Sequence, residues 1–162
     1  MCIESTPVFF WFADGENGYL SNWYPADFTV DGLLFHNMEQ FKMYNRAILF
    51  GDEASAKEIL ETADPETAKN LGMAAQPADE ALWDANCYNI IVKGLMGKFG
   101  QNEDLRAQLL STGNRPMAEA SPFDPVNGIG LSAEDAANTP MEQWPGTNLL
   151  GKALMEIRAN LS

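Results

Sequence analysis

Short hydrophobic runs separated by turn residues occupy the first third of the chain and predict strands. Val8–Phe12 is an apolar run that ends before the turn signal Asp14-Gly15. Two further runs, Phe28–Val30 and Leu33–Phe35, flank Asp31-Gly32, a dipeptide typical of two-residue β-hairpins. We therefore expect a hairpin and one other short strand in this region.

From Asn37 onwards the hydrophobic positions recur at helical spacing, and Asn or Asp stands at each expected helix start. The pattern predicts helices over residues 37–50, 52–62, 64–71, 79–99 and 102–111, several of them ending at glycine. Residues 115–120 are interpreted as a strand. A last helix is expected from Asn148 to about Leu161, with a buried stripe of leucine, alanine and isoleucine.

Residues 121–146 contain four prolines and three glycines, which predicts a long ordered loop. Loops of that length in a compact domain usually carry function. Together the elements indicate an α+β fold, a mostly helical single domain over residues 1–162 with a small antiparallel sheet.

Composition narrows the class of protein. A chain of 162 residues and 17.8 kDa is long enough for one hydrophobic core. It has no apolar run of membrane-spanning length and no secretion signal at its start, and its two cysteines, Cys2 and Cys87, form no disulfide framework. We expect a cytoplasmic protein with no membrane association.

The net charge of −13 argues against binding of nucleic acid, which depends on lysine and arginine neutralising phosphates. A small anionic ligand needs only a few donors and stays compatible with this charge. No cluster of cysteine, histidine and aspartate has metal-ligand spacing, so no metal is expected. The single histidine, His36, is interpreted as a surface residue of the hairpin.

Glu39 lies in the first turn of the helix over residues 37–50, and Arg46 follows seven residues later on the same face. Glu39 is either a solvated first-turn acid favoured by the helix dipole or a pocket carboxylate. In a pocket it could bind ribose hydroxyls or act as a general base, because cleavage of an N-glycoside passes through an oxocarbenium-like state. Spacing alone favours the solvated acid.

Three more candidates have equally plain structural explanations. Asn22 stands among large hydrophobic residues and is either a turn residue or an amide that contacts base or ribose. Trp83 is interpreted as a core residue or a lid over a pocket. Lys98 suits the C-terminal end of its helix electrostatically, and that explanation suffices by itself.

The loop supplies Asp124 and Asn127 beside Gly128 and Gly130, which permit close backbone approach to a ligand. Both could instead be turn formers. Trp144 precedes the last helix, and Asn148 is either the cap of that helix or a ligand amide, or both.

In their order along the chain, these segments resemble the YbiA-like/NADAR family over roughly residues 8–160. Each motif is weak by itself, and their common order is what makes the resemblance strong. The motifs are Leu20–Pro25, Phe35–Phe41 with Phe50–Asp52, Asp64–Gly72, Trp83 with Lys98-Phe99, Glu119–Asp124 with Gly128–Leu131, and Trp144–Arg158.

The resemblance implies an N-glycosidase that acts on riboflavin-pathway aminopyrimidine intermediates or a related nucleoside, with no cofactor. It assigns catalytic roles to Glu39 and Asp124. It also assigns pocket positions to Asn22, Trp83, Lys98, Trp144 and Asn148.

This chain departs from the family pattern at several positions. Arg46 replaces a lysine, and a guanidinium cannot act as the nucleophilic amine of a Schiff base. It can still pair with Glu39 or hold a phosphate. Met73 and Cys87 replace basic residues, and Asn127 replaces a tryptophan. These changes indicate a less anionic substrate than the family norm, or binding without turnover.

We therefore predict hydrolysis of a small ribosylated base. Glu39 would activate water or orient the ribose, Asp124 would stabilise positive charge, and Arg46 and Lys98 would contact phosphate or the leaving base. The alternatives are a non-catalytic ADP-ribose or nucleotide-binding module and a hydrolase of ADP-ribosylated guanine in nucleic acid.

Overall fold

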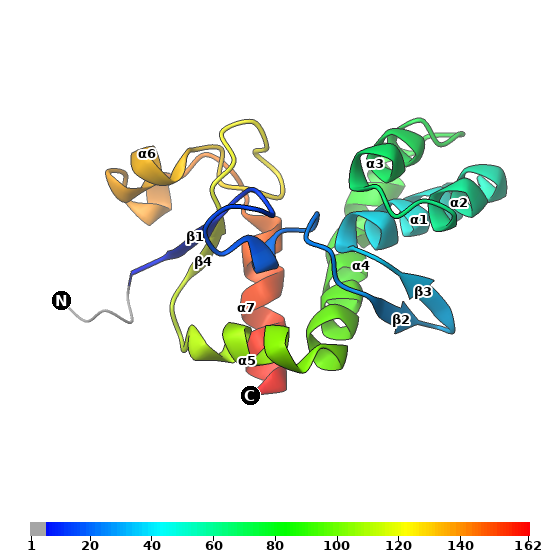
Figure 1. Ribbon diagram of the computed structural model, residues 1–162. Coiled ribbons are helices and arrows are strands. Elements are labelled where there is room, and N and C mark those ends of the chain that lie inside the picture. The colour runs from blue at the N-terminus through cyan, green and yellow to red at the C-terminus, as the bar shows by residue number, and fades with distance from the viewer. Residues whose placement is uncertain (1–5) are drawn as a thin grey trace. The chain divides into compact units, whose positions relative to one another are not determined.

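The computed structural model describes residues 6–162, whose elements divide into two units (Figure 1). The central unit, residues 22–103, holds a hairpin and four helices. The terminal unit joins residues 6–21 to residues 104–162. Within the described residues no helix is long and apolar enough to cross a membrane.

The hairpin of the central unit forms where the sequence predicts it. Strands β2 (Phe28–Val30) and β3 (Leu33–Phe35) pair antiparallel, with Val30 opposite Leu33. Asp31 and Gly32 adopt φ angles of 53° and 83°, and such positive values at both central residues are what a type I′ turn requires. His36 follows β3 and pairs with Asp27 at 2.8 Å, on the partly exposed side that the sequence indicates.

Four predicted helices of the central unit are confirmed at their starts by side-chain caps. They are α1 (Met38–Phe50), α2 (Glu53–Leu60), α3 (Pro65–Met73) and α4 (Glu80–Gln101), capped by Asn37, Asp52, Asp64 and Asp79. Gly51 ends α1 with a φ of 79°. The expected stops of α3 before Gly72 and of α4 before Gly100 are wrong, because α3 continues to Met73 and α4 to Gln101.

Helix α1 is the centre of this unit, since α2, α3 and α4 all pack against it. Its buried side includes Met43, Ala47 and Phe50, which join a core cluster with residues of α2 and α3. The rings of Phe28 and Phe35 lie 5.9 Å apart and both contact Phe41 of α1. The hairpin and the helices therefore share one hydrophobic interior.

The terminal unit is built on a pair of parallel strands. Strand β1 (Val8–Phe10) pairs with β4 (Met117–Glu119), and helix α7 (Leu149–Leu161) packs against β4. Helix α5 (Glu103–Ser111) precedes β4, as predicted. The α+β class is thus confirmed, but the strands form two separate pairs, of which only the hairpin is antiparallel. Strands so distant in sequence are not tied to opposite directions by a turn.

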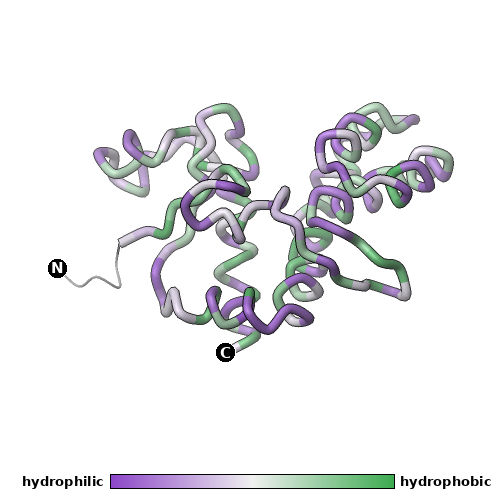
Figure 2. Tube along the Cα trace, viewed as in Figure 1, coloured by the Kyte–Doolittle hydropathy of each residue, from purple (hydrophilic) through white to green (hydrophobic). Residues whose placement is uncertain are grey.

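The long ordered loop expected over residues 121–146 is partly helical, which corrects its assignment as loop throughout. Helix α6 (Ala133–Ala137) is capped by Ser132, whose side chain accepts a hydrogen bond from the Asp135 amide, and a 3₁₀ helix follows over Met141–Gln143. Ala136 joins Ala118 and Ile129 in a buried cluster. Hydrophobic and hydrophilic positions alternate along the segment and the other helices (Figure 2).

Candidate active site

Glu39 is a buried acid paired with an amine on its own helix. The residue is 3% exposed, and its Oε2 lies 3.2 Å from Nζ of Lys42, which is buried as well. Capping of α1 by Asn37 sets the orientation of this first turn. The solvated-acid interpretation of Glu39 is therefore wrong, since the carboxylate is withdrawn from water and stabilised by an opposite charge.

Lys42 is a site residue that the sequence analysis missed. Its spacing of three residues from Glu39 places both side chains on one helical face, and that spacing is the signal that could have found it. A buried ion pair adds little to stability in general, so its presence at a helix start is better explained by chemistry than by folding.

Asn22 lies beside the same turn. Its backbone carbonyl accepts the Glu39 amide at 2.9 Å, and the residue is 5% exposed. Among residues 6–162 no hydrogen-bond donor reaches its side-chain oxygen. A buried amide oxygen left unpaired costs free energy unless a ligand supplies a donor. A ribose hydroxyl or a base amine has the required chemistry.

Arg46 does not pair with Glu39. Its guanidinium binds Glu80 at the start of α4, and its Nε donates to the Gly72 carbonyl at 3.1 Å. The hydrogen bond that Arg46 donates to Glu80 keeps the pKa of the Glu80 carboxyl below its ordinary value. The Arg46 guanidinium carbon also lies 5.3 Å from the centre of the Trp83 ring, which is partly buried and packs on the core cluster.

Lys98 is enclosed near the end of α4. Its side chain has no exposed surface, and its Nζ lies 5.7 Å from the Tyr24 ring and 5.0 Å from the Phe99 ring. Burial disfavours the ammonium form and lowers the pKa of Lys98 to about 7. The favourable charge at a helix C-terminus, which explained Lys98 from the sequence, does not explain a lysine that is completely buried. The group is suited to proton transfer near neutral pH.

In the terminal unit, Asp124 shapes the loop that carries it. Its Oδ1 accepts the Val126 and Asn127 amides, each at 2.9 Å, as a turn-forming aspartate does. The side-chain oxygen of Asn127 is buried and receives no donor within residues 6–162. Asn127 thus shares with Asn22 the property of an unpaired amide oxygen.

Trp144 and Asn148 are engaged by the protein itself. The Trp144 indole donates to the Thr139 carbonyl at 3.0 Å. Asn148 occupies the cap position of α7 with a φ of 54°, yet its side chain does not cap the helix. It bridges to β4, accepting the Glu119 amide and donating to the Met117 carbonyl at 2.8 Å. Asn148 therefore stands at the predicted cap position, while its side chain joins α7 to β4.

The candidate residues consequently fall into two groups, each described by itself. The central unit brings Asn22, Glu39 and Lys42 together at the start of α1, and Lys98 lies in the same unit. The terminal unit holds the loop with Asp124 and Asn127. No group of three or more potential metal ligands occurs within residues 6–162.

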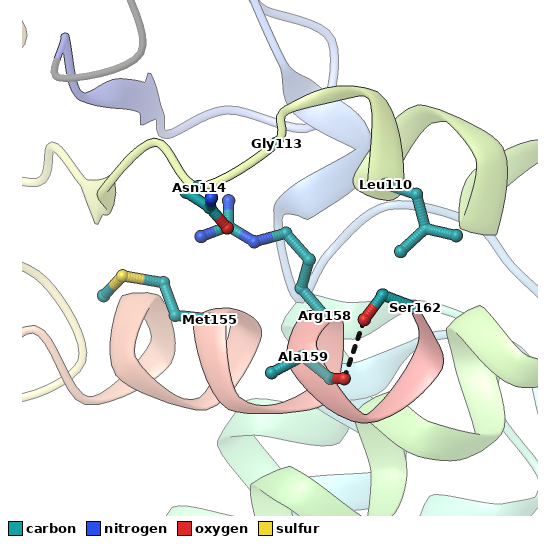
Figure 3. Close-up of a pocket in the computed structure, with 7 residues that line it drawn as sticks. All are labelled: Leu110, Gly113, Asn114, Met155, Arg158, Ala159 and Ser162. Carbon is teal, nitrogen blue, oxygen red and sulfur yellow. Dashed lines mark hydrogen bonds between the residues drawn. The ribbon is translucent and has the colours of Figure 1, made fainter.

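A separate hollow of about 280 Å³ lies in the terminal unit, beside the end of α7 (Figure 3). Arg158 projects from α7 towards Asn114, and its Nη1 donates to Thr112 Oγ1 at 2.9 Å. The lining contains no aspartate or glutamate side chain. A hollow without a carboxylate cannot supply the base or the charge stabilisation that glycoside hydrolysis needs.

Buried polar side chains with unpaired acceptors, set in a mostly helical α+β fold, suit the binding of a small polar ligand. The chain belongs to the NADAR domain family, which it matches over residues 9–162.

Individual relatives span nearly the whole chain. The sequence is 42% identical to N-glycosidase R617 of Acanthamoeba polyphaga mimivirus, over 85% of this chain and 84% of that protein. It is 30% identical to riboflavin biosynthesis protein VVA0006 of Vibrio vulnificus, over 98% of this chain and 40% of that protein. The NMR structure of the Escherichia coli protein YbiA superposes with a TM-score of 0.80 at 26% identity, covering 99% of this chain and 87% of that one.

Proposed function

We propose that this protein is an N-glycosidase that hydrolyses the bond between ribose, or ribose phosphate, and a base. Membership of the NADAR family and the 42% identity to a named N-glycosidase support this enzyme class. The relative named for riboflavin biosynthesis supports an aminopyrimidine of that pathway, or a related nucleoside, as the substrate.

The buried Glu39–Lys42 pair is the observation that carries the mechanism. A carboxylate of this kind accepts a proton from a water molecule as the water oxygen attacks C1′ of the ribose. The C1′–N bond breaks and its electron pair passes to the base. Lys42 supplies the opposite charge that keeps an ionised carboxylate tolerable away from water. Hydrolysis of this kind needs water but no cofactor.

Two further groups would stabilise the cationic sugar and the departing base. Asp124, whose Oδ1 accepts two loop amides, would stabilise the positive charge that develops on the sugar. Lys98 has a pKa of about 7 and would protonate the leaving nitrogen. The amide oxygens of Asn22 and Asn127 would accept from ribose hydroxyls or base amines.

Arg46 would bind a substrate phosphate in competition with Glu80. The Glu80 side chain is largely exposed and can be displaced, and a guanidinium holds phosphate with two parallel hydrogen bonds. Trp83 would support Arg46 through its ring. Trp144 and Asn148 would act indirectly, by holding the loop and β4 of the terminal unit in place.

The proposal is tested by product analysis of the purified protein. It would be incubated with riboflavin-pathway aminopyrimidine ribose phosphates, with their dephosphorylated forms and with ADP-ribosylated guanosine. Liquid chromatography and mass spectrometry would follow release of the free base. We expect release by the wild-type protein and a fall of at least about 100-fold in the Glu39→Gln variant. Equal release by both proteins would contradict the role of Glu39.

The activity of an Arg46→Lys variant distinguishes an enzyme from a binding module that has lost turnover. If Arg46 contributes to the reaction, Arg46→Lys lowers activity, because lysine cannot hold phosphate in the same bidentate geometry. A gain of activity in Arg46→Lys, from a wild type that binds substrate without turnover, would establish the binding module instead.

A further inference from the structure

Arg158, in the terminal unit, is a buried cation that no carboxylate neutralises. The residue is 8% exposed, and within residues 6–162 no acidic side chain forms an ion pair with it. The one ionisable group found to act on it there is the Tyr19 phenol, which is neutral near pH 7. Arginine is almost never buried so completely unless an opposite charge accompanies it. An anion from outside the chain would supply that charge.

The position of Arg158 in the last turn of α7 does not explain its burial. The helix dipole favours a cation at this end of a helix, but the effect operates at the surface as well. Arg106 donates from an exposed position to the Leu161 carbonyl of α7 at 3.0 Å. Burial lowers the pKa of Arg158, yet a guanidinium remains charged near neutral pH. The buried charge therefore still lacks a partner.

The Arg158 guanidinium is held in place by the protein. Its Nη1 donates to Thr112 Oγ1, and that hydroxyl donates in turn to the Leu109 carbonyl in the last turn of α5. A guanidinium has five N–H groups, and no other of them donates to an atom of residues 6–162. The side chain is directed towards Asn114 (Figure 3). A donor group oriented in advance loses little conformational entropy when it binds a ligand.

The hollow beside Arg158 has the size and lining of a site for a small organic anion. Its volume of about 280 Å³ is close to the lower end of the roughly 300–1,000 Å³ that small-molecule sites occupy. Leu110, Met155 and Ala159 provide apolar surface. Asn114 provides an exposed amide that donates to no atom of residues 6–162. No aspartate or glutamate side chain in the lining would repel an anion.

Arg115 adds positive charge to the same part of the terminal unit. Burial raises the pKa of the Tyr19 phenol, and the nearby charges of Arg158 and Arg115 oppose that rise. Arg115 donates to the Pro7 carbonyl and forms no ion pair within residues 6–162. A chain of net charge −13 thus contains two neighbouring arginines without carboxylate partners, and their local field attracts anions.

We infer that the hollow beside Arg158 binds the phosphate group of a small phosphomonoester, with Arg158 and Asn114 as the donors. A guanidinium holds phosphate through two parallel hydrogen bonds, and the charge of the ester approaches about −2 near neutral pH. Leu110 and Met155 would contact the organic part of the ligand. The inference does not rest on the proposed function, because this hollow lacks the carboxylate that glycoside hydrolysis needs.

The first test locates the site by NMR titration of the isotope-labelled protein with ribose 5-phosphate. We expect saturable shifts of the Gly113, Asn114 and Ala159 amide signals at ligand concentrations up to about 10 mM. Absence of saturable shifts at these amides would overturn the inference. Shifts confined to Gly72 and Glu80, which bind Arg46, would overturn it as well and would assign the phosphate to the central unit.

Three further ligands identify the chemistry that the hollow recognises. Ribose should cause no shifts at the three amides, and inorganic phosphate should bind about tenfold more weakly than ribose 5-phosphate. Equal affinity for inorganic phosphate would overturn the assignment of an ester. Equal affinity for acetate would overturn the assignment of a phosphate, since any oxyanion would then suffice.

The second test places a negative charge at the hollow without removing a buried residue. Ala159→Glu adds a carboxylate to the lining, whereas Asn160→Glu makes the same change of charge at the next residue, which is exposed and does not line the hollow. Calorimetry should show ribose 5-phosphate binding at least about tenfold more weakly to Ala159→Glu and within about twofold of the wild type to Asn160→Glu. Equal weakening in both variants would overturn the inference, because it would reflect net charge alone.

Discussion

Glu39, Lys42 and Lys98 are ionisable side chains that the fold removes almost completely from water. Each charge would be costly in such a place without compensation. Glu39 and Lys42 compensate each other across 3.2 Å, whereas the charged form of Lys98 has the Tyr24 and Phe99 rings near it. At the scale of single residues, the central unit therefore holds a buried Glu39–Lys42 pair and a lysine with a lowered pKa.

The pH dependence of the free energy of unfolding should reflect the burial of Lys98. Its folded pKa of about 7 lies below the ordinary value of 10.5, so the unfolded chain binds more protons between these pH values. The contribution of Lys98 to the free energy of unfolding then rises with pH across that interval, by up to about 1.4 kcal/mol per pH unit. Urea unfolding should show Lys98→Met to be more stable than the wild type near pH 7, with the difference shrinking as pH rises. A difference independent of pH would contradict the lowered pKa.

Glu80 should restrain Arg46 from binding phosphate. Removal of the carboxylate charge in Glu80→Gln leaves the guanidinium available, because the Arg46–Glu80 ion pair is lost. We expect a several-fold lower KM for a ribose-phosphate substrate and an unchanged KM for its dephosphorylated form. Glu66→Gln, at an exposed glutamate of α3, is the matched control. Equal changes for both substrates would show that Arg46 does not contact phosphate.

At the scale of elements, the site depends on close packing of α3 against α1. Gly72 of α3 lies where a Cβ atom would overlap the Met43 side chain of α1. The Gly72 carbonyl also accepts the Arg46 Nε hydrogen bond, so the same contact fixes the guanidinium. Gln40 of α1 also donates to the Ile59 carbonyl of α2 and to the Thr62 carbonyl just beyond that helix.

Two glycine substitutions should change the free energy of unfolding in opposite directions. Gly72→Ala forces Met43 or the backbone to move and should lower the free energy of unfolding by about 1–3 kcal/mol. Gly100→Ala, near the end of α4, meets open space and should raise it by about 0.5–1 kcal/mol, since alanine restricts the unfolded chain. Urea unfolding measures both variants. If Gly72→Ala proved neutral, the close contact of α3 with α1 would not be a constraint on the fold.

At the scale of the whole molecule, the net charge of −13 limits the class of ligand. Long-range repulsion opposes a polyanion, whereas one phosphate can be held by a few local donors. The charge therefore agrees with a small ribosylated base as substrate.

Nucleic acid should bind weakly or not at all. We expect no saturable change in fluorescence anisotropy when the protein is added to a labelled single-stranded oligonucleotide at low salt, with or without an ADP-ribosylated guanine. The physical reason is the lack of net positive charge that would displace counterions from the strand. Saturable binding of the modified oligonucleotide that weakens as salt is raised would instead favour the nucleic-acid hydrolase.

Local sequence determined the elements of this protein. Asn37, Asp52, Asp64 and Asp79 cap helices within three residues of themselves, and Asp31-Gly32 closes a hairpin between adjacent strands. Such interactions depend on neighbours in the chain, so their residue types suffice to predict them. The order of the motifs likewise indicated the family that the comparison confirmed.

Tertiary structure alone decided which partners the site residues have. The pattern placed Glu39 and Arg46 on one helical face, but the start of α4 brought Glu80 to Arg46 and left Lys42 to pair with Glu39. Asn148 bonds β4, distant in sequence, in place of the helix that it precedes. Burial of Lys98 and the parallel pairing of β1 with β4 also arise between residues far apart in the chain, and the energies of such contacts are absent from any local pattern.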